Sequence, residues 1–319
     1  MRRAFSLVFV LCYGVAVLAQ ACKQVMPAIV VEGEARTFDS SMTAERLHAK
    51  IGRLLVPITR LERITSFRVL ILMDVSGSME VNEPPVVYQR KVLALVRDRL
   101  QELVATLPHD VKVQYGEFNS YAVFGGDFSS DRKVLESSLP EMTERLKHRG
   151  PKKTALYDAI QQAILQFGSV QPGDSILVVT DGGDNNSNLS DKKVREEAAA
   201  RGIRLFTILV KGESQPYEEQ SWDVTLNLAE RTGGSVHIID SRRTAWMDAK
   251  TSQAEQQNLS RFWQNEVLAG YLLYFEVPAG PKNRKWLLRI DRMPGQKKED
   301  LASYPSRLNA CLSQSASIH

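Results

Sequence analysis

Five oxygen-bearing side chains stand out by their types and by their places in the chain. Residues 74–78 read DVSGS and place one carboxylate and two hydroxyls directly after an apolar run. Residues 180–182 read TDG and follow a second apolar run, and Thr154 lies between the two segments. Hydroxyl and carboxylate oxygens, without sulfur or imidazole, suit Mg²⁺, with Mn²⁺ and Ca²⁺ as alternatives. We therefore expect a divalent-cation site formed by Asp74, Ser76, Ser78, Thr154 and Asp181.

Two apolar runs must position these residues. Residues 67–74 (FRVLILMD) and 175–181 (SILVVTD) are continuous and of strand length, which is typical of strands buried on both faces. Further strand patterns cover residues 111–118, 121–124, 204–210 and 235–239, and helical patterns cover residues 87–107, 131–147, 154–167, 190–202, 222–230 and 253–268. This alternation predicts an α/β fold with a doubly wound, mostly parallel six-stranded sheet and helices on both faces. Ligands of such sheets bind at the carboxyl ends of the strands.

Three segments carry a family resemblance. They are DVSGSM at 74–79, TALYDAI at 154–160 and VVTDGGDN at 178–185. In order, spacing and strand context they resemble the von Willebrand factor A domain, which is Rossmann-like, and its metal-ion-dependent adhesion site. The resemblance covers about residues 66–270. The later segments YLLYFEVPAG and KWLLRID are similar to the tail of a secreted von Willebrand A-related family found mainly in acidobacteria.

The resemblance implies a role for each of the five side chains. Ser76 and Ser78 would bind the metal through their hydroxyls, and Thr154 would bind it directly or through water. Asp74 and Asp181 would hold coordinating waters or bind directly, and one position would stay open for an acidic group of a partner. Mg²⁺ prefers six oxygen ligands, and if both aspartates act only through water, neutral hydroxyls and waters leave its charge largely uncompensated. We therefore expect a protein partner that presents an Asp or Glu.

The residues around these five have simpler interpretations. Asp184, Asn185 and Asn186 are expected to shape the loop rather than bind the ion, and Asp158 to act as a structural hydrogen-bonding residue. Lys152 and Lys153 are expected to be solvated. Trp222, Trp246 and Trp263 are expected in the core or at an interface.

Enzyme chemistry is poorly supported. A phosphatase nucleophile at Asp74 would need a second acid two residues later, where Ser76 stands. A Ser-His-Asp triad would need a histidine in the strand-end loops, and none is there. The histidines are His48, His109, His148, His237 and His319. We expect an exported, metal-dependent protein-binding module for adhesion or assembly, with a structural cell-envelope component bearing a vestigial site as the alternative and a metal-dependent hydrolase third.

Composition narrows the class of protein further. The 319 residues are 43% hydrophobic and 24% charged, which excludes collagen, coiled-coil and disordered chains. The 41 basic and 37 acidic residues give a net charge of +4, without the concentrated basic surplus of a nucleic-acid-binding protein. Three cysteines are too few for a disulfide scaffold. No nucleic-acid partner is expected.

Residues 1–21 have the pattern of a signal peptide. Arg2 and Arg3 precede the uncharged residues 4–19, and Ala19 and Ala21 are small where a signal peptidase reads the chain. The apolar run is shorter than the roughly 20 residues of a membrane span. An uncleaved anchor is the alternative. We expect export to the periplasm, the cell envelope or the medium.

Cys22 follows the expected cut directly. A cysteine there could be lipidated, as in a bacterial lipoprotein, remain a free thiol, or pair in a disulfide with Cys311 in an oxidising compartment. These alternatives stay open at this point, with lipidation and the disulfide ranked equally, and a membrane contact is expected only through lipidation. Cys12 would leave with the signal peptide.

The flanks of the central region are expected to form a small β-rich accessory unit. We divide the chain into a signal peptide (1–21), an N-terminal accessory segment (22–65), the von Willebrand A-like region (66–270) and a C-terminal β-hairpin with a frayed tail (271–319). Residues 28–38 have strand character, and 44–55 predict a short helix. Residues 271–277 and 285–290 predict the two strands of the hairpin.

Overall fold

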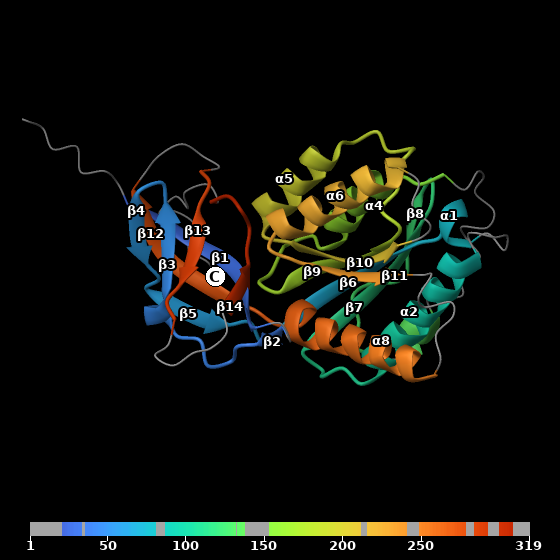
Figure 1. Ribbon diagram of the computed structural model, residues 1–319, viewed down its shortest axis with the longest axis horizontal. Coiled ribbons are helices and arrows are strands. Elements are labelled where there is room, and N and C mark those ends of the chain that lie inside the picture. The colour runs from blue at the N-terminus through green and yellow to red at the C-terminus, as the bar shows by residue number, and fades with distance from the viewer. Residues whose placement is uncertain are drawn as a thin grey trace, which may run out of the picture.

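The computed structural model describes residues 21–33, 36–80, 87–131, 133–137, 153–211, 216–240, 249–278, 284–292 and 300–308. Within these ranges the chain forms a helix-covered sheet beside a smaller unit of strands (Figure 1). Residues 1–20 of the expected signal peptide lie outside them, as does most of the predicted helix 131–147. None of the helices in the described ranges combines the length and the apolar character that crossing a membrane requires.

The larger unit contains a six-stranded sheet. In spatial order its strands are β11 (Val236–Asp240), β10 (Arg204–Lys211), β9 (Asp174–Thr180), β6 (Phe67–Asp74), β7 (Val111–Phe118) and β8 (Ala122–Phe124). Neighbouring strands are parallel except β8, which runs antiparallel to β7. The predicted mostly parallel, six-stranded sheet is confirmed.

Helices cover both faces of this sheet, as predicted (Figure 1). One face carries α2 (Val87–Ala105) and α8 (Ala249–Phe262), and the other carries α4 (Leu156–Gln166), α5 (Asp191–Arg201) and α6 (Pro216–Arg231). The side chains of β6 contribute to both cores. Val69, Ile71 and Met73 lie in the core with α2 and α8, whereas Leu70 and Leu72 lie in the core with α4. A strand buried on both faces needs this continuous apolar run.

The smaller unit combines strands from both flanks, as predicted for an accessory β unit. One of its sheets contains β1 (Ala21–Glu32), β2 (Thr37–Phe38), β5 (Arg60–Arg63), β12 (Tyr271–Pro278) and β14 (Asp300–Ser303), and the other contains β3 (Leu47–Ile51), β4 (Leu54–Pro57) and β13 (Leu287–Ile290). Residues 21–28 of β1 pair antiparallel with β12, and residues 29–32 pair antiparallel with β14. Met26, Leu273 and Phe275 are fully buried between the strands.

The predicted short helix over residues 44–55 is wrong. Only a 3₁₀ turn, η1 (Ala44–Arg46), is helical, and β3 and β4 follow as an antiparallel pair. Apolar residues at 47, 51, 54 and 55 fit the helical period, which explains the error. Gly52 turns the chain at φ +60°, a backbone conformation that favours glycine, so the chain reverses between the two strands instead of continuing as a helix.

The predicted C-terminal hairpin is also wrong. Both strands exist, but β12 pairs with β1 and β5, whereas β13 pairs with β3 in the other sheet. Strands from residues 21–63 pair with β12 and β13 in place of the pairing between these two that a local hairpin would have made. The tail is not wholly frayed either, because β14 pairs with β1 and Pro305 accepts a hydrogen bond from Trp286 Nε1 at 2.7 Å. Residues 293–299 and 309–319 lie outside the described ranges.

Cys22 lies in β1 and is buried. It is disulfide-bonded, and its Sγ also accepts a hydrogen bond from Gln24 Nε2 at 3.0 Å. The other two cysteines, Cys12 and Cys311, fall outside the described residues.

Glu266 joins the two units. It lies in a π-helical turn, η2 (Trp263–Val267), that continues α8, and its carboxylate is almost fully buried. Arg36, between β1 and β2, donates to both carboxylate oxygens at 2.7 and 2.6 Å, and the Ser235 hydroxyl also donates to Glu266. A bidentate arginine pair of this kind is directional, so it constrains how the strand unit sits on α8.

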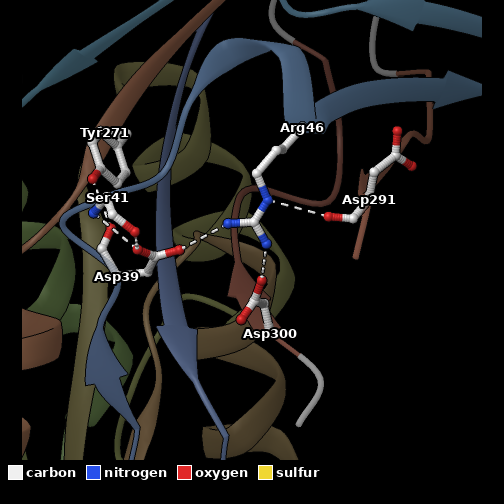
Figure 2. Close-up of polar contacts among 6 residues, drawn as sticks. All are labelled: Asp39, Ser41, Arg46, Tyr271, Asp291 and Asp300. Atoms are coloured by element: carbon white, nitrogen blue, oxygen red, sulfur yellow. Dashed lines mark hydrogen bonds and ion pairs between the residues drawn. The ribbon is translucent and has the colours of Figure 1, made fainter. Parts of the chain in front are cut away.

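Arg46 is the centre of a buried polar network in the smaller unit (Figure 2). Its guanidinium donates to Asp39 Oδ2 at 3.3 Å, to Asp300 Oδ2 at 2.6 Å and to the Asp291 carbonyl at 3.2 Å. Asp39 also accepts from the Ser41 hydroxyl, and its carbonyl accepts from Tyr271 Oη. The Arg46 guanidinium thus contacts residues that are far apart in sequence, and it links β14 to the loop after β2.

We expect Arg46→Met to lower the free energy of unfolding by about 3–5 kcal/mol, because it leaves two buried carboxylates without their cation. The side chains of Asp39 and Asp300 are only 2% and 3% exposed. Denaturant unfolding of the purified protein measures the change.

Arg289→Met is the matched control. Arg289 is 63% exposed and faces Asp291 at 3.5 Å, so its loss should change the unfolding free energy by no more than about 0.5 kcal/mol. Equal effects of the two substitutions would contradict a structural role for the Arg46 network.

Candidate metal centre

The candidate ligands lie at one edge of the six-stranded sheet. β6 and β9 are parallel neighbours, with Met73 opposite Val179, so Asp74 and Thr180 end their strands at the same level. Asp181 follows immediately. Thr154 stands just before α4, and the next residue, Ala155, donates its N–H to the carbonyl of Asn119, directly after β7. The sheet therefore brings the three predicted segments to a common edge.

Asp74 is fully buried, and both of its carboxylate oxygens are hydrogen-bonded. Oδ1 accepts from the Ser76 N–H at 2.9 Å, and Oδ2 accepts from Thr180 Oγ1 at 2.7 Å. Burial, followed by the nearby charge of Asp181, raises the pKa of Asp74 to about 7 from an ordinary value of 3.8, and the hydrogen bonds offset only part of this. Two carboxylates are thus held close enough to repel each other.

The two serine hydroxyls lie beside each other after β6. Ser76 Oγ and Ser78 Oγ are 3.2 Å apart, at the start of the short helix α1 (Gly77–Glu80). Ser76 is buried, whereas Ser78 is exposed and Asp181 is partly exposed. Ser78 and Asp181 are therefore the candidate ligands that face solvent, while Asp74, Ser76 and Thr154 are covered.

Thr154 is held by the loop that follows β9. Its N–H donates to Asn185 Oδ1 at 3.0 Å, and its carbonyl accepts from the N–H groups of Asn185 and Asn186, each at 3.0 Å. The same loop satisfies the first N–H groups of α4, since Asp184 Oδ1 accepts from Leu156 at 2.8 Å. One loop thus carries Asp181 and also places Thr154, as the sequence predicted for a loop-shaping role of residues 184–186.

Asp158 has the structural role predicted for it. Its Oδ2 accepts from the N–H and the side-chain amide of Asn188, and its Oδ1 accepts from the Leu189 N–H at 3.0 Å. These bonds fasten the end of the same loop to the first turn of α4. Lys153 is exposed, as expected, and Lys152 lies outside the described residues.

Trp222 and Gly183 hold Asp181 in place by hydrogen bonds. Trp222 Nε1 donates to the Asp181 carbonyl at 3.1 Å, and the Gly183 N–H donates to Asp181 Oδ1 at 3.1 Å. Gly182, between them, has φ +89°, and a Cβ there would lie 3.3 Å from Trp222 Cδ1. Trp222 is buried, as predicted, and so is Trp263, whereas Trp246 lies outside the described residues.

These residues fit a divalent cation by their charge and donor chemistry. Among the described residues, no Lys, Arg or His side chain forms an ion pair with Asp74 or Asp181, so a cation between them would relieve their repulsion. Carboxylate and hydroxyl oxygens are hard ligands that suit Mg²⁺. Among the described residues, no group of three or more His, Cys, Asp or Glu side chains is placed to hold a metal ion, so a metal here would depend on Ser76, Ser78 and Thr154 as well.

Two supporting residues were missed in the sequence. Thr180 was read only as the end of a strand, yet its hydroxyl binds both Asp74 and the Gly182 N–H, the latter at 3.1 Å. A hydroxyl residue at the carboxyl end of a buried strand, next to an acid, is the signal that could have found it. Trp222 was expected only in the core or at an interface, but it lies 41 residues after Asp181, and its hydrogen bond to that residue depends on the packing of α6, which no local sequence pattern determines.

Part of the chain matches a known family model. Residues 69–183 match the family model of the von Willebrand factor type A domain, a range that includes all five candidate ligands. This segment therefore carries the sequence features of that domain. No curated protein matches the chain.

Several solved structures are similar to this chain at low identity. A conserved hypothetical protein, BatB from Bacteroides thetaiotaomicron, is 20% identical with a TM-score of 0.44, covering 62% of this chain and 100% of its own. A von Willebrand factor type A protein from Catenulispora acidiphila is 13% identical with a TM-score of 0.47, covering 84% and 75%. An aerotolerance-related membrane protein from Bacteroides fragilis is 17% identical with a TM-score of 0.43, covering 61% and 100%.

The raised pKa of Asp74 has a measurable consequence for the protein kept free of metal with EDTA. Because the folded state holds this proton more tightly than the unfolded state, stability should fall as pH rises from about 4 to about 7 and stay low above that. We expect Asp74→Asn, which cannot ionise, to be more stable than wild type by about 1–3 kcal/mol at pH 8 and to lose this advantage at pH 4.5.

Thermal and denaturant unfolding of both proteins at the two pH values test this difference. Asp110→Asn, at the opposite edge of the sheet, is the control and should show no such pH-dependent advantage. An Asp74→Asn advantage that is the same at pH 4.5 and pH 8 would show that Asp74 is ionised in the folded protein at both.

Proposed function

We propose that this protein is a divalent-cation-dependent protein-binding module, used for adhesion or assembly. The observation that carries the proposal is the pair of adjacent carboxylates, Asp74 and Asp181, beside two serine hydroxyls at the carboxyl edge of a parallel sheet. The match of residues 69–183 to the von Willebrand factor type A domain supports it, because such domains commonly take part in protein interactions. Membership of the chain in that family is part of the proposal.

Ser76, Ser78 and Thr154 would hold the ion with their hydroxyls, and Asp74 and Asp181 would balance its charge directly or through water. A bound Mg²⁺ would supply a Lewis-acidic position that accepts one more oxygen ligand. Ser78 and Asp181 face solvent, so a partner would approach from their side. If Asp74 and Asp181 act through water, only neutral oxygens contact the ion, and an Asp or Glu side chain of the partner is then the natural ligand for that position.

Metal binding is the first test. We expect Asp181→Ala to weaken Mg²⁺ binding by at least about 10–100-fold in isothermal titration, since the ion loses one of its two carboxylates. Mg²⁺ at 100 times the wild-type Kd should stabilise the wild type by about 2.7 kcal/mol, whereas the same concentration should stabilise Asp181→Ala by no more than about 1.4 kcal/mol.

Asp110→Ala is the matched control, because Asp110 is an exposed aspartate at the opposite edge of the sheet. It should bind Mg²⁺ as the wild type does. Unchanged Mg²⁺ affinity in Asp181→Ala would remove Asp181 from the site, and an absence of saturable binding to wild type would sink the metal centre.

Partner capture separates this function from a structural cell-envelope role with a vestigial site. Immobilised protein should retain a partner from envelope extract in Mg²⁺ and release it in EDTA, and Asp74→Ala should retain none. Capture that is indifferent to both EDTA and Asp74→Ala would favour the structural role. A hydrolase would instead show turnover of a phosphoester or peptide that Asp74→Ala abolishes.

Export is part of the proposal, with residues 1–21 as its signal and Cys22 as the first mature residue. The burial and disulfide bonding of Cys22 support the disulfide alternative over lipidation, with Cys311 as the partner left in the mature chain. Intact mass and N-terminal sequencing of envelope material should give a chain that starts at Cys22 and lacks two hydrogens. An added acyl mass on Cys22 would establish the lipoprotein instead, and an N-terminus at Met1 would refute processing.

A further inference from the structure

Lys211 is a cation held beside the candidate metal centre without a described anionic partner. It ends β10, and its Nζ lies 4.3 Å from the centre of the Trp222 ring. The same ring donates a hydrogen bond to the carbonyl of Asp181. A cation over an aromatic face is attracted to it, which limits the positions that the ammonium samples.

The sheet places this ammonium at the edge where the candidate ligands lie. β10 is the parallel neighbour of β9, and Leu209 pairs with Thr180, so Lys211 is level with the residues just after Asp181. Lys211 is partly exposed. Across the described ranges, no carboxylate, that of Asp181 included, lies within ion-pair distance of Lys211, so its charge is not used to neutralise the metal ligands.

We propose that Lys211 is a specificity residue that binds a second acidic side chain of the partner, next to the one that completes the metal. The inference rests on the proposed function, in which the partner's first acidic side chain binds the metal ion. The preferred ligand is then an extended segment with two acids in close succession. In a strand, residues i and i+2 point the same way and lie about 7 Å apart, a spacing suited to two neighbouring positive sites.

A lysine held over an aromatic ring, as Lys211 is, should affect which ligand is preferred more than it affects the overall affinity. An ion pair that stays open to solvent contributes little by itself, but its loss is specific to the ligand that carries the matching charge. The Trp222 ring reduces the ordering cost of the lysine side chain on binding. A ligand with one acid would gain nothing from Lys211.

Three blocked pentapeptides test the inference in the presence of Mg²⁺. Their central residues are Asp-Ser-Asp, Asp-Ser-Asn and Asn-Ser-Asp, with glycine at each end, and binding is followed by NMR titration to millimolar concentration. The wild type should bind the two-acid peptide about 3- to 10-fold more tightly than the better one-acid peptide. Lys211→Met keeps the aliphatic stem but not the charge, so it should abolish this preference and leave one-acid binding and Mg²⁺ affinity within about twofold.

Lys112→Met controls for the general effect of removing a positive charge. Lys112 is exposed at the start of β7, at the opposite edge of the sheet, so the preference for two acids should survive. A preference that is unchanged in Lys211→Met, with Mg²⁺-dependent binding intact, would overturn the role of Lys211 alone. Binding of none of the peptides, or binding that EDTA leaves unchanged, would overturn the metal-dependent module and the inference together.

Discussion

The carboxylates of Asp74 and Asp181 lie close together because β6 and β9 are parallel neighbours that end at the same edge of the sheet. Their repulsion, added to the burial of Asp74, makes ionisation of that residue costly. The fold offsets this cost with two donors, the Ser76 N–H and the Thr180 hydroxyl, and no described basic side chain forms an ion pair with either carboxylate. In the free protein a proton on Asp74 relieves part of this repulsion, and the cation of the proposed function would relieve it in the same way.

The loop after β9 couples the parts of this site. It contributes Asp181, it binds both the N–H and the carbonyl of Thr154, and it satisfies the first N–H groups of α4. Trp222 then joins the same loop to α6 and brings Lys211 to its side. Changes at Asn185 or Trp222 would therefore act on a bound ion or partner through position, without loss of any oxygen ligand.

The local sequence was sufficient to predict the position of a residue where a single strand and the loop after it determine that position. The apolar run of β6 must be buried on both faces, and a short loop follows it, so the places of Asp74, Ser76 and Ser78 could be predicted without tertiary contacts. The same holds for β9 and Asp181. The local sequence was insufficient where strand pairing depends on segments far away in the chain. The apolar spacing of β3 and β4 also fits a helix, and β12 and β13 pair in two different sheets instead of with each other. Local sequence also could not predict the hydrogen bond from Trp222 to Asp181 or the position of the Lys211 charge beside it. Both depend on how α6 and β10 pack against each other.

The pairing of β1 with β12 and β14 also joins segments from the two ends of the described chain, which bears on the order of assembly. Residues 21–32 cannot meet residues 271–278 and 300–303 at low entropic cost until the intervening sheet has drawn the flanks together. During synthesis from the N-terminus the helix-covered sheet can therefore form while β1 is still unpaired with β12 and β14 and exposed to solvent. An N-terminal strand left without its neighbours offers a free edge to other chains, so nascent copies that stall before residue 300 are the species most exposed to misassembly.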